Sequence, residues 1–128
     1  MTRFLIVAAC GALGAVARYG LGRLLPTTAG WPWPTLTANV LGGLLMGALT
    51  GWLAFRSGAQ GETIRLFAAV GVLGGFTTFS AFSLETVLMI ERRDFAMAGG
   101  YVVASVVVSV AALFLGLMLA RRAFGAAV

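Results

Sequence analysis

Four long apolar segments separated by short polar connections dominate the chain. They cover about residues 4–25, 35–55, 63–90 and 95–120, and the prolines and most of the charged residues fall outside them. Each segment is close to the roughly 20 residues that a helix needs to cross the hydrocarbon core of a bilayer. None alternates apolar and polar residues as a barrel strand does. The pattern predicts one all-α membrane domain over residues 1–128 with four transmembrane helices.

The connections have the composition expected at a membrane surface. Residues 26–34 (PTTAGWPWP) are rich in turn-forming residues and carry two tryptophans suited to the membrane–water interface. Residues 56–62 (RSGAQGE) form a polar loop, and residues 91–94 (ERRD) form a tight charged turn.

Composition agrees with a membrane protein. Of 128 residues, 60% are hydrophobic and 10% are charged, and the mean hydropathy is +0.99. A soluble domain carries about 25% charged residues. The chain is therefore predicted to be a multi-pass membrane protein in a lipid bilayer, with no room for a second, soluble domain.

The chain offers little material for enzyme chemistry. It contains no histidine and a single cysteine, Cys10, so zinc sites, haem ligation and Cys/His nucleophiles have no ligands or bases within the chain. Residues 7–10 (VAAC) resemble a lipoprotein cleavage site, but the apolar run before them is too short and continues past the cysteine, which favours a first membrane helix. We expect no enzymatic activity.

The basic residues are nine arginines, and they are divided almost equally between the two sides of the membrane. One side would carry Arg3, Arg56, Arg65, Arg121 and Arg122, and the other Arg18, Arg23, Arg92 and Arg93. Such residues mark topology rather than nucleic-acid binding, so no nucleic-acid partner is expected. Because orientation follows the Lys/Arg bias, this chain is predicted to insert both ways and to form an antiparallel dimer. A single orientation fixed by another feature is the alternative.

Small residues at intervals of four predict close helix packing. Gly43, Gly47 and Gly51 form such a series in the second segment, and Gly71 and Gly75 repeat the spacing in the third. These faces are predicted to associate tightly.

The third segment contains the strongest local signal, residues 74–85 (GGFTTFSAFSLE). Two glycines followed by two β-branched threonines are poor helix formers. They predict a break in the helix at mid-membrane depth, which would free backbone carbonyls able to hold a cation. A simple kink is the alternative.

Polar residues within the apolar segments indicate the candidate site, because such residues tend to face a partner or an aqueous path. Tyr101, Ser105 and Ser109 are spaced at four-residue intervals and form one stripe of hydroxyls; hydrogen bonds to their own helix are the alternative. The other candidates are Arg18, Thr37, Asn39 and Glu85.

The chemistry of this set favours an anion. An arginine, an amide and several hydroxyls supply positive potential and donors, and the positive edges of Phe79 and Phe82, three residues apart, could face an anion. Glu85 is open to three interpretations: a proton site, an acceptor for nearby hydroxyls, or a residue near the interface.

These residues and motifs resemble the Fluc (CrcB) family of bacterial fluoride channels. The resemblance extends over the whole chain and rests on residues 11–18 (GALGAVAR), 35–43 (TLTANVLGG) and 74–85, together with the Tyr/Ser stripe. It implies a dual-topology subunit in an antiparallel homodimer of the bacterial inner membrane, with two pathways that let cytoplasmic fluoride leave passively and a structural sodium ion (Na⁺) at the dimer centre.

The resemblance also implies roles for single residues. Phe79, Phe82, Asn39 and Ser109 would line the fluoride pathway, and Arg18 would stand at an aqueous vestibule. The polar route would continue along the residues Ser105, Tyr101, Thr37 and Glu85. The backbone carbonyls of Gly74 and Thr77 would hold the sodium ion.

Two other functions are compatible with parts of this sequence. A small multidrug-resistance-type, proton-coupled exporter shares the four-helix architecture, but it needs a membrane carboxylate for a cationic substrate, and the first segment instead offers Arg18. A non-transporting assembly factor would use the glycine faces only to bind partner helices.

Overall fold

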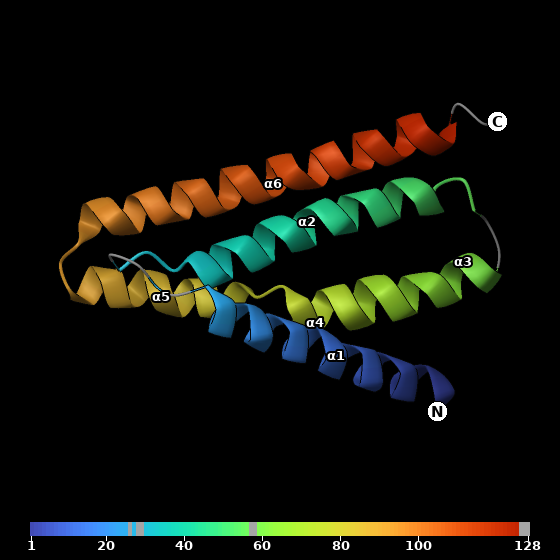
Figure 1. The fold of residues 1–128 in the computed structure, drawn as a ribbon, viewed down its shortest axis with the longest axis horizontal. Helices are drawn as coiled ribbons and strands as arrows, with labels where there is room; N and C mark the ends of the chain where they lie inside the picture. The colour runs from blue at the N-terminus through green and yellow to red at the C-terminus, as the bar shows by residue number, and fades with distance from the viewer. Residues whose placement is uncertain (26, 28–29, 57–58, 126–128) are drawn as a thin grey trace.

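The computed structural model describes residues 1–25, 27, 30–56 and 59–125. The elements of this part of the chain are helices (Figure 1). Four helical stretches are long and apolar enough to cross a membrane: Thr2–Leu24, Trp33–Leu53, Ala59–Glu91 and Phe95–Gly125. The protein is accordingly a multi-pass, all-α membrane protein.

Three of the four stretches are single α-helices: α1 (Thr2–Leu24), α2 (Trp33–Leu53) and α6 (Phe95–Gly125). Helix α6 extends five residues beyond the predicted end at residue 120. Arginines explain part of the extension, because Arg121 and Arg122 are good helix formers and Arg122 lies in the last turn, where a cation is favoured.

The third stretch is made of several parts. It begins as α3 (Ala59–Ile64), continues as a π-helix, η1 (Arg65–Leu73), and as the short α4 (Gly74–Phe76), and resumes as α5 (Phe79–Glu91). Its start at Ala59 lies four residues before the predicted one.

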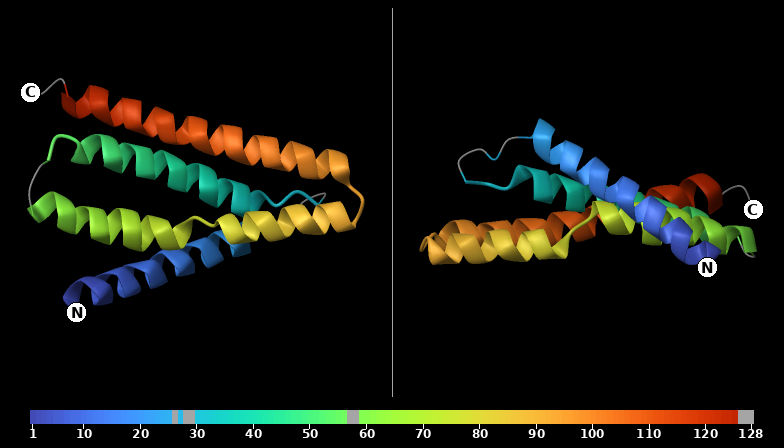
Figure 2. Two further views of the ribbon diagram at one scale, coloured as in Figure 1. Left: turned by 180° about the vertical axis from the view of Figure 1, so that it is seen from behind. Right: turned by 90° about the horizontal axis from the view of Figure 1, so that it is seen from below.

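The helices pair two by two. Helices α2 and α6 lie side by side and run in the same direction, and α1 crosses the third stretch near η1 and α4 (Figures 1 and 2). Both described ends of the chain lie at the same end of the molecule, as an even number of crossings requires. Helix α5 turns back into α6 through Arg93, whose φ is 60°.

Glycines bring α2 and α6 close together. A Cβ added to Gly43 would lie 2.8 Å from the Ser109 carbonyl oxygen, and one added to Gly51 would lie 2.8 Å from the Ala120 Cβ. Gly47 and Gly116 meet the opposite backbone even more closely. The prediction that the series in the second segment is a packing face is confirmed.

The second glycine pair, Gly71 and Gly75, brings the third stretch close to α1. A Cβ on Gly75 would lie 3.0 Å from the Gly11 Cα, and one on Gly71 would meet Cys10. Both predicted glycine faces therefore pack within the chain.

The third stretch is interrupted at the two threonines. Thr77 (φ −79°, ψ 157°) and Thr78 (φ −151°, ψ 119°) have extended backbones, whereas Gly74 and Gly75 are helical. The glycines thus allow the approach to α1, and the threonines supply the interruption. Thr78 caps the restarted helix, since its hydroxyl accepts a hydrogen bond from the Ala81 N–H at 3.2 Å.

A small core closes one end of the bundle. Tyr101 is fully buried beside Met89 and Ala98. The Trp31 ring lies 5.7 Å from the Tyr101 ring in an edge-on arrangement. Elsewhere many large apolar side chains are exposed, as expected for helices in lipid.

Candidate functional site

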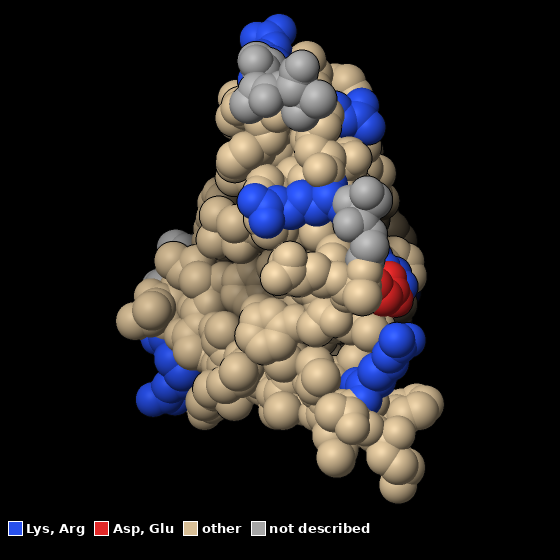
Figure 3. All heavy atoms as spheres, turned by 90° about the vertical axis from the view of Figure 1, so that its right-hand side faces the viewer, with Lys and Arg blue, Asp and Glu red and all other residues tan. Residues whose placement is uncertain are grey.

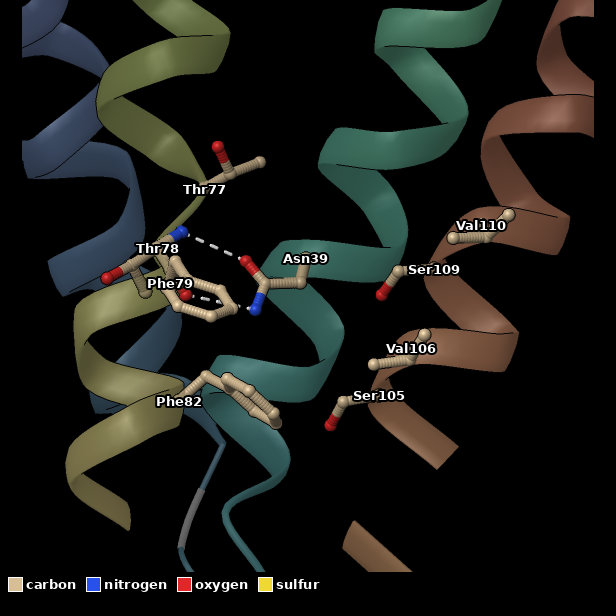
Figure 4. A pocket seen from close by; sticks show the side chains of 9 residues that line it. All are labelled: Asn39, Thr77, Thr78, Phe79, Phe82, Ser105, Val106, Ser109 and Val110. Carbon is tan, nitrogen blue, oxygen red and sulfur yellow. Dashed lines mark hydrogen bonds between the residues drawn. The ribbon is translucent and has the colours of Figure 1, made fainter. Parts of the chain in front are cut away.

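A pocket of about 300 Å³ lies where α2, the interruption, α5 and α6 meet (Figure 4). The residues that line it are Asn39, Thr77, Thr78, Phe79, Phe82, Ser105, Val106, Ser109 and Val110. Five of the eight residues expected along the pathway are therefore brought together. Tyr101 and Glu85 lie next to this group, and Thr37 is not among its lining residues.

Helix α6 contributes two hydroxyls that are unusual for membrane helices. Ser105 is buried and Ser109 is half-buried, and both point toward the pocket (Figure 4). Neither Oγ atom has a hydrogen-bond partner in the part of the chain that the structure describes. On α5, by contrast, Ser83 and Thr86 donate to the carbonyls four residues before them at 2.9 and 2.8 Å. The α6 hydroxyls are therefore free to bind something in the pocket.

Two phenylalanine rings face these hydroxyls from α5 (Figure 4). The ring centroids of Phe79 and Phe82 lie 5.5 Å apart with an interplanar angle of 44°. Phe82 also packs on Tyr101 at 5.4 Å, whereas Phe79 is 78% exposed. One ring is thus held by the core, and the other borders the open side of the pocket.

Asn39 connects α2 to the interruption. Its Nδ2 donates to the Thr78 carbonyl oxygen at 3.1 Å, and its Oδ1 accepts from the Thr78 N–H at 2.9 Å (Figure 4). An amide nitrogen carries two hydrogens. Asn39 therefore holds the backbone of the interruption and keeps a second N–H for a ligand.

Glu85 accepts two short hydrogen bonds. The Thr35 hydroxyl donates to Oε1 and the Tyr101 hydroxyl to Oε2, both at 2.6 Å. Of the three interpretations left open by the sequence, an acceptor for nearby hydroxyls is the one that this geometry matches.

Thr35, rather than Thr37, is the threonine at this carboxylate. Residues two apart on a helix point to opposite sides, so α2 cannot present both. The sequence did contain the signal, because Thr35 and Asn39 are four residues apart and share one face of α2.

A second cavity of about 300 Å³ contains the predicted vestibule residue, Arg18. Arg18 Nε donates to the Gly75 carbonyl at 3.5 Å. Arg23, which sequence reasoning did not single out, lines the same cavity. Thr35 and Thr78 line it as well, and Thr78 also lines the first pocket. The two cavities therefore adjoin at the interruption.

The two carbonyls expected to hold a cation have lost their usual helical donors. In a continuous helix the Thr78 N–H would donate to Gly74 and the Ala81 N–H to Thr77. Here the Thr78 N–H donates to Asn39 and the Ala81 N–H to the Thr78 hydroxyl. Hard cations prefer such oxygen ligands, so Gly74 and Thr77 fit a sodium ion.

Known proteins resemble the chain over nearly its whole length. A family profile described as CrcB-like protein, Camphor Resistance (CrcB), matches residues 5–117. The chain is 59% identical over 126 residues to the "Fluoride-specific ion channel FluC" of Caulobacter sp. (strain K31), covering 97% of this chain and 98% of the relative.

Proteins of the same name from two other bacteria match the chain to a similar extent. Identity is 59% for Phenylobacterium zucineum (strain HLK1) and 54% for Caulobacter vibrioides (strain NA1000 / CB15N), each over 97% of this chain and 99% of the relative. These relatives give no support to a multidrug exporter. The chain belongs to the CrcB-like family, whose matched members are named as ion channels and not as enzymes.

Proposed function

We propose that the protein is a fluoride-selective, passive anion channel. The observation that carries the proposal is the pair of hydroxyls without partners, on Ser105 and Ser109, facing the rings of Phe79 and Phe82 across one pocket. Hydroxyl donors and aromatic edges are suited to an anion. The relatives named as fluoride-specific channels support fluoride as that anion.

Selectivity follows from the chemistry of the ion. Fluoride is small and strongly hydrated, so a narrow path must replace its water with closely spaced donors. The hydroxyls, the second N–H of Asn39 and the phenyl edges provide them. Larger halides would not fit the same contacts.

The route begins at the cavity of Arg18, whose charge attracts anions, and passes the interruption at Thr78 into the pocket. It continues past Tyr101 and Glu85, where Thr35 stands in place of the expected Thr37. Glu85 holds the hydroxyls of Thr35 and Tyr101 in fixed orientations.

The functional unit in this proposal is an antiparallel, dual-topology homodimer with two pathways. Two features support it: the nearly equal division of arginines between the membrane sides and the pocket's open side at the exposed Phe79. A second copy would close the pocket and bring the two interruptions together at mid-membrane depth.

A structural sodium ion would then lie at the dimer centre. The Gly74 and Thr77 carbonyls of both copies would hold it, because their helical donors are used elsewhere. It would stabilise the interface and take no part in fluoride transfer. If so, exchanging sodium for N-methylglucamine during purification should dissociate the dimer; a dimer that persists unchanged would contradict this role.

Export follows from passive conduction. In the bacterial inner membrane, fluoride accumulated in the cytoplasm would leave down its electrochemical gradient and so become less toxic. The chain carries no nucleotide-binding G-x-x-x-x-G-K-[ST] motif that would energise transport.

Fluoride efflux from liposomes containing the purified protein tests the proposal. Valinomycin and potassium supply the countercharge path, a fluoride electrode reports release, and chloride-loaded vesicles are the control. We expect rapid fluoride release with negligible chloride release. No fluoride release from a folded protein would overturn the proposal in favour of an exporter or an assembly factor.

A further inference from the structure

One end of the molecule is strongly basic (Figure 3). The arginines at this end are Arg3, Arg56, Arg65, Arg121 and Arg122. The chain has four acidic side chains, and Glu62 is the one that lies here: Glu85 is bonded to Tyr101 beside the pocket, and Glu91 and Asp94 are at the α5–α6 turn. Glu62 forms an ion pair with Arg65 at 3.0 Å. The other four arginines therefore leave this end with a large excess of positive charge.

Three of these arginines, Arg56, Arg121 and Arg122, are at the neighbouring ends of α2 and α6. The Arg56 guanidinium lies over the Trp52 ring, 4.3 Å from its centroid. Its backbone N–H donates to the Leu53 carbonyl at 2.9 Å, so Arg56 is fixed to the last turn of α2. A Cβ on Gly51 would lie 3.5 Å from the Arg121 backbone N, which brings the end of α6 beside the same turn.

The position of this group relative to the bilayer follows from helix length. Helix α6 has 31 residues and is therefore about 46 Å long, against about 30 Å for the hydrocarbon core. At least one end of α6 must therefore enter the headgroup layer, and Arg121 and Arg122 favour the end at its last turn. Phe55 and Phe124 are 43% and 46% exposed at the same level, and Phe55 meets Gly125 of α6. Phenylalanine rings carry no polar group, so these exposed rings favour contact with acyl chains over water.

We propose that Arg56, Arg121 and Arg122, with Trp52, form a binding site for the headgroup of an anionic phospholipid. The planar guanidinium group matches the phosphodiester through two parallel hydrogen bonds, and stacking on Trp52 holds the Arg56 group in place. Acyl chains would descend along Phe55 and Phe124. The site is independent of the fluoride pathway, so either proposal can fail without the other.

Trp52 makes the site measurable. The full-length protein is placed in phosphatidylcholine vesicles that contain phosphatidylglycerol, with bromine on the acyl chains of one lipid or the other. Bromine quenches tryptophan emission at contact, and subtracting the signal of the W52F variant removes the part due to Trp31 and Trp33. We expect Trp52 to be quenched more strongly by brominated phosphatidylglycerol than by the brominated zwitterionic lipid.

Charge variants then locate the site. R56Q and R121Q–R122Q should lower the preference for the anionic lipid, on the order of fivefold for each arginine removed. R121K–R122K keeps the charge but loses the planar group, so its loss should be smaller. R92Q–R93Q is the matched control, because it removes two arginines from the opposite end, and it should keep the preference.

Three results would overturn the proposal. One is an unchanged preference in R56Q and R121Q–R122Q. Another is an equal loss in R92Q–R93Q, which would indicate only general attraction to the protein's charge. The third is loss of the preference on adding inorganic phosphate at the concentration of the lipid, which would indicate a site for free anions. Circular dichroism confirms that each variant is folded.

Discussion

Asn39 and Thr78 exchange two hydrogen bonds, so one amide side chain of α2 supplies the acceptor that the Thr78 N–H lost at the interruption and also donates to the Thr78 carbonyl. We expect N39L to leave the Thr78 N–H without a partner, at a cost on the order of 1–3 kcal/mol, while the Thr78 carbonyl keeps the first helical bond of α5. N39D keeps the acceptor and loses the donor, so its loss should be smaller. Thermal unfolding in detergent measures the change, and fluoride efflux should fall with it. An N39L variant as stable as the parent would contradict the bridging role.

The two threonines at the start of α2 should behave differently. T35V removes a donor to Glu85 and should slow fluoride efflux, because the carboxylate loses one of its two fixed hydroxyls. T37V is the matched control from the opposite side of the helix and should conduct as the parent does. Slow efflux in T37V together with normal efflux in T35V would restore the assignment made from sequence.

Most of the fold could be predicted from the sequence, because the lipid bilayer restricts which backbone structures can cross it. In lipid, the apolar segments must be helices, and they are. The glycine spacings also predicted where backbones meet, since only glycine permits a carbonyl such as that of Ser109 so close to Gly43. What the sequence could not give is the partner of each segment, because lipid and protein surfaces are equally apolar.

Most of the residues of the candidate site could be predicted from the sequence, but the hydrogen bonds between them could not. Ser105 and Ser109 could be placed in one stripe by helical spacing alone. The Asn39–Thr78 bridge and the choice of Thr35 depend on how α2 is rotated against α5. That rotation is set by long-range packing, which no local spacing encodes.

Removing the pocket hydroxyls should separate conduction from stability. Because Ser105 Oγ is buried without a partner among the described residues, S105A should leave the unfolding temperature unchanged or raise it. The same substitution, and S109A, should slow fluoride efflux about tenfold, since a hydrogen bond to an ion is lost. A lowered unfolding temperature with normal efflux would instead indicate a structural role.

Substitutions of the two phenylalanines should differ in their effect on stability but have the same effect on fluoride efflux. Phe79 is 78% exposed in the single chain, so F79I should leave the stability of the single chain unchanged. Phe82 packs on Tyr101, so F82I should cost about 1 kcal/mol. Both should greatly slow fluoride efflux, because each loses an aromatic edge. Near-normal efflux in both variants would place the pathway elsewhere.

Two glycines of α6 provide a matched pair for the packing. A Cβ on Gly116 would meet the Leu44 carbonyl, whereas Gly99 has nothing within 4 Å. G116A should cost about 1–3 kcal/mol of stability through overpacking. G99A should be neutral or stabilising, since alanine is the better helix former. Equal unfolding temperatures for the two variants would mean that α2 and α6 are farther apart than described.

The close packing of α2 on α6 has a consequence for the bore of the pathway. The serines lie on α6, the rings lie on α5, and Asn39 of α2 holds the interruption from which α5 starts. The distance between the serine side and the ring side of the pocket is therefore set by α2. The distance of α2 from α6 in turn depends on Gly43, Gly47 and Gly51. Residues that never touch the permeating ion thus determine the width available to it. Substitutions at these glycines can therefore alter ion selectivity while every ion-contacting side chain stays the same.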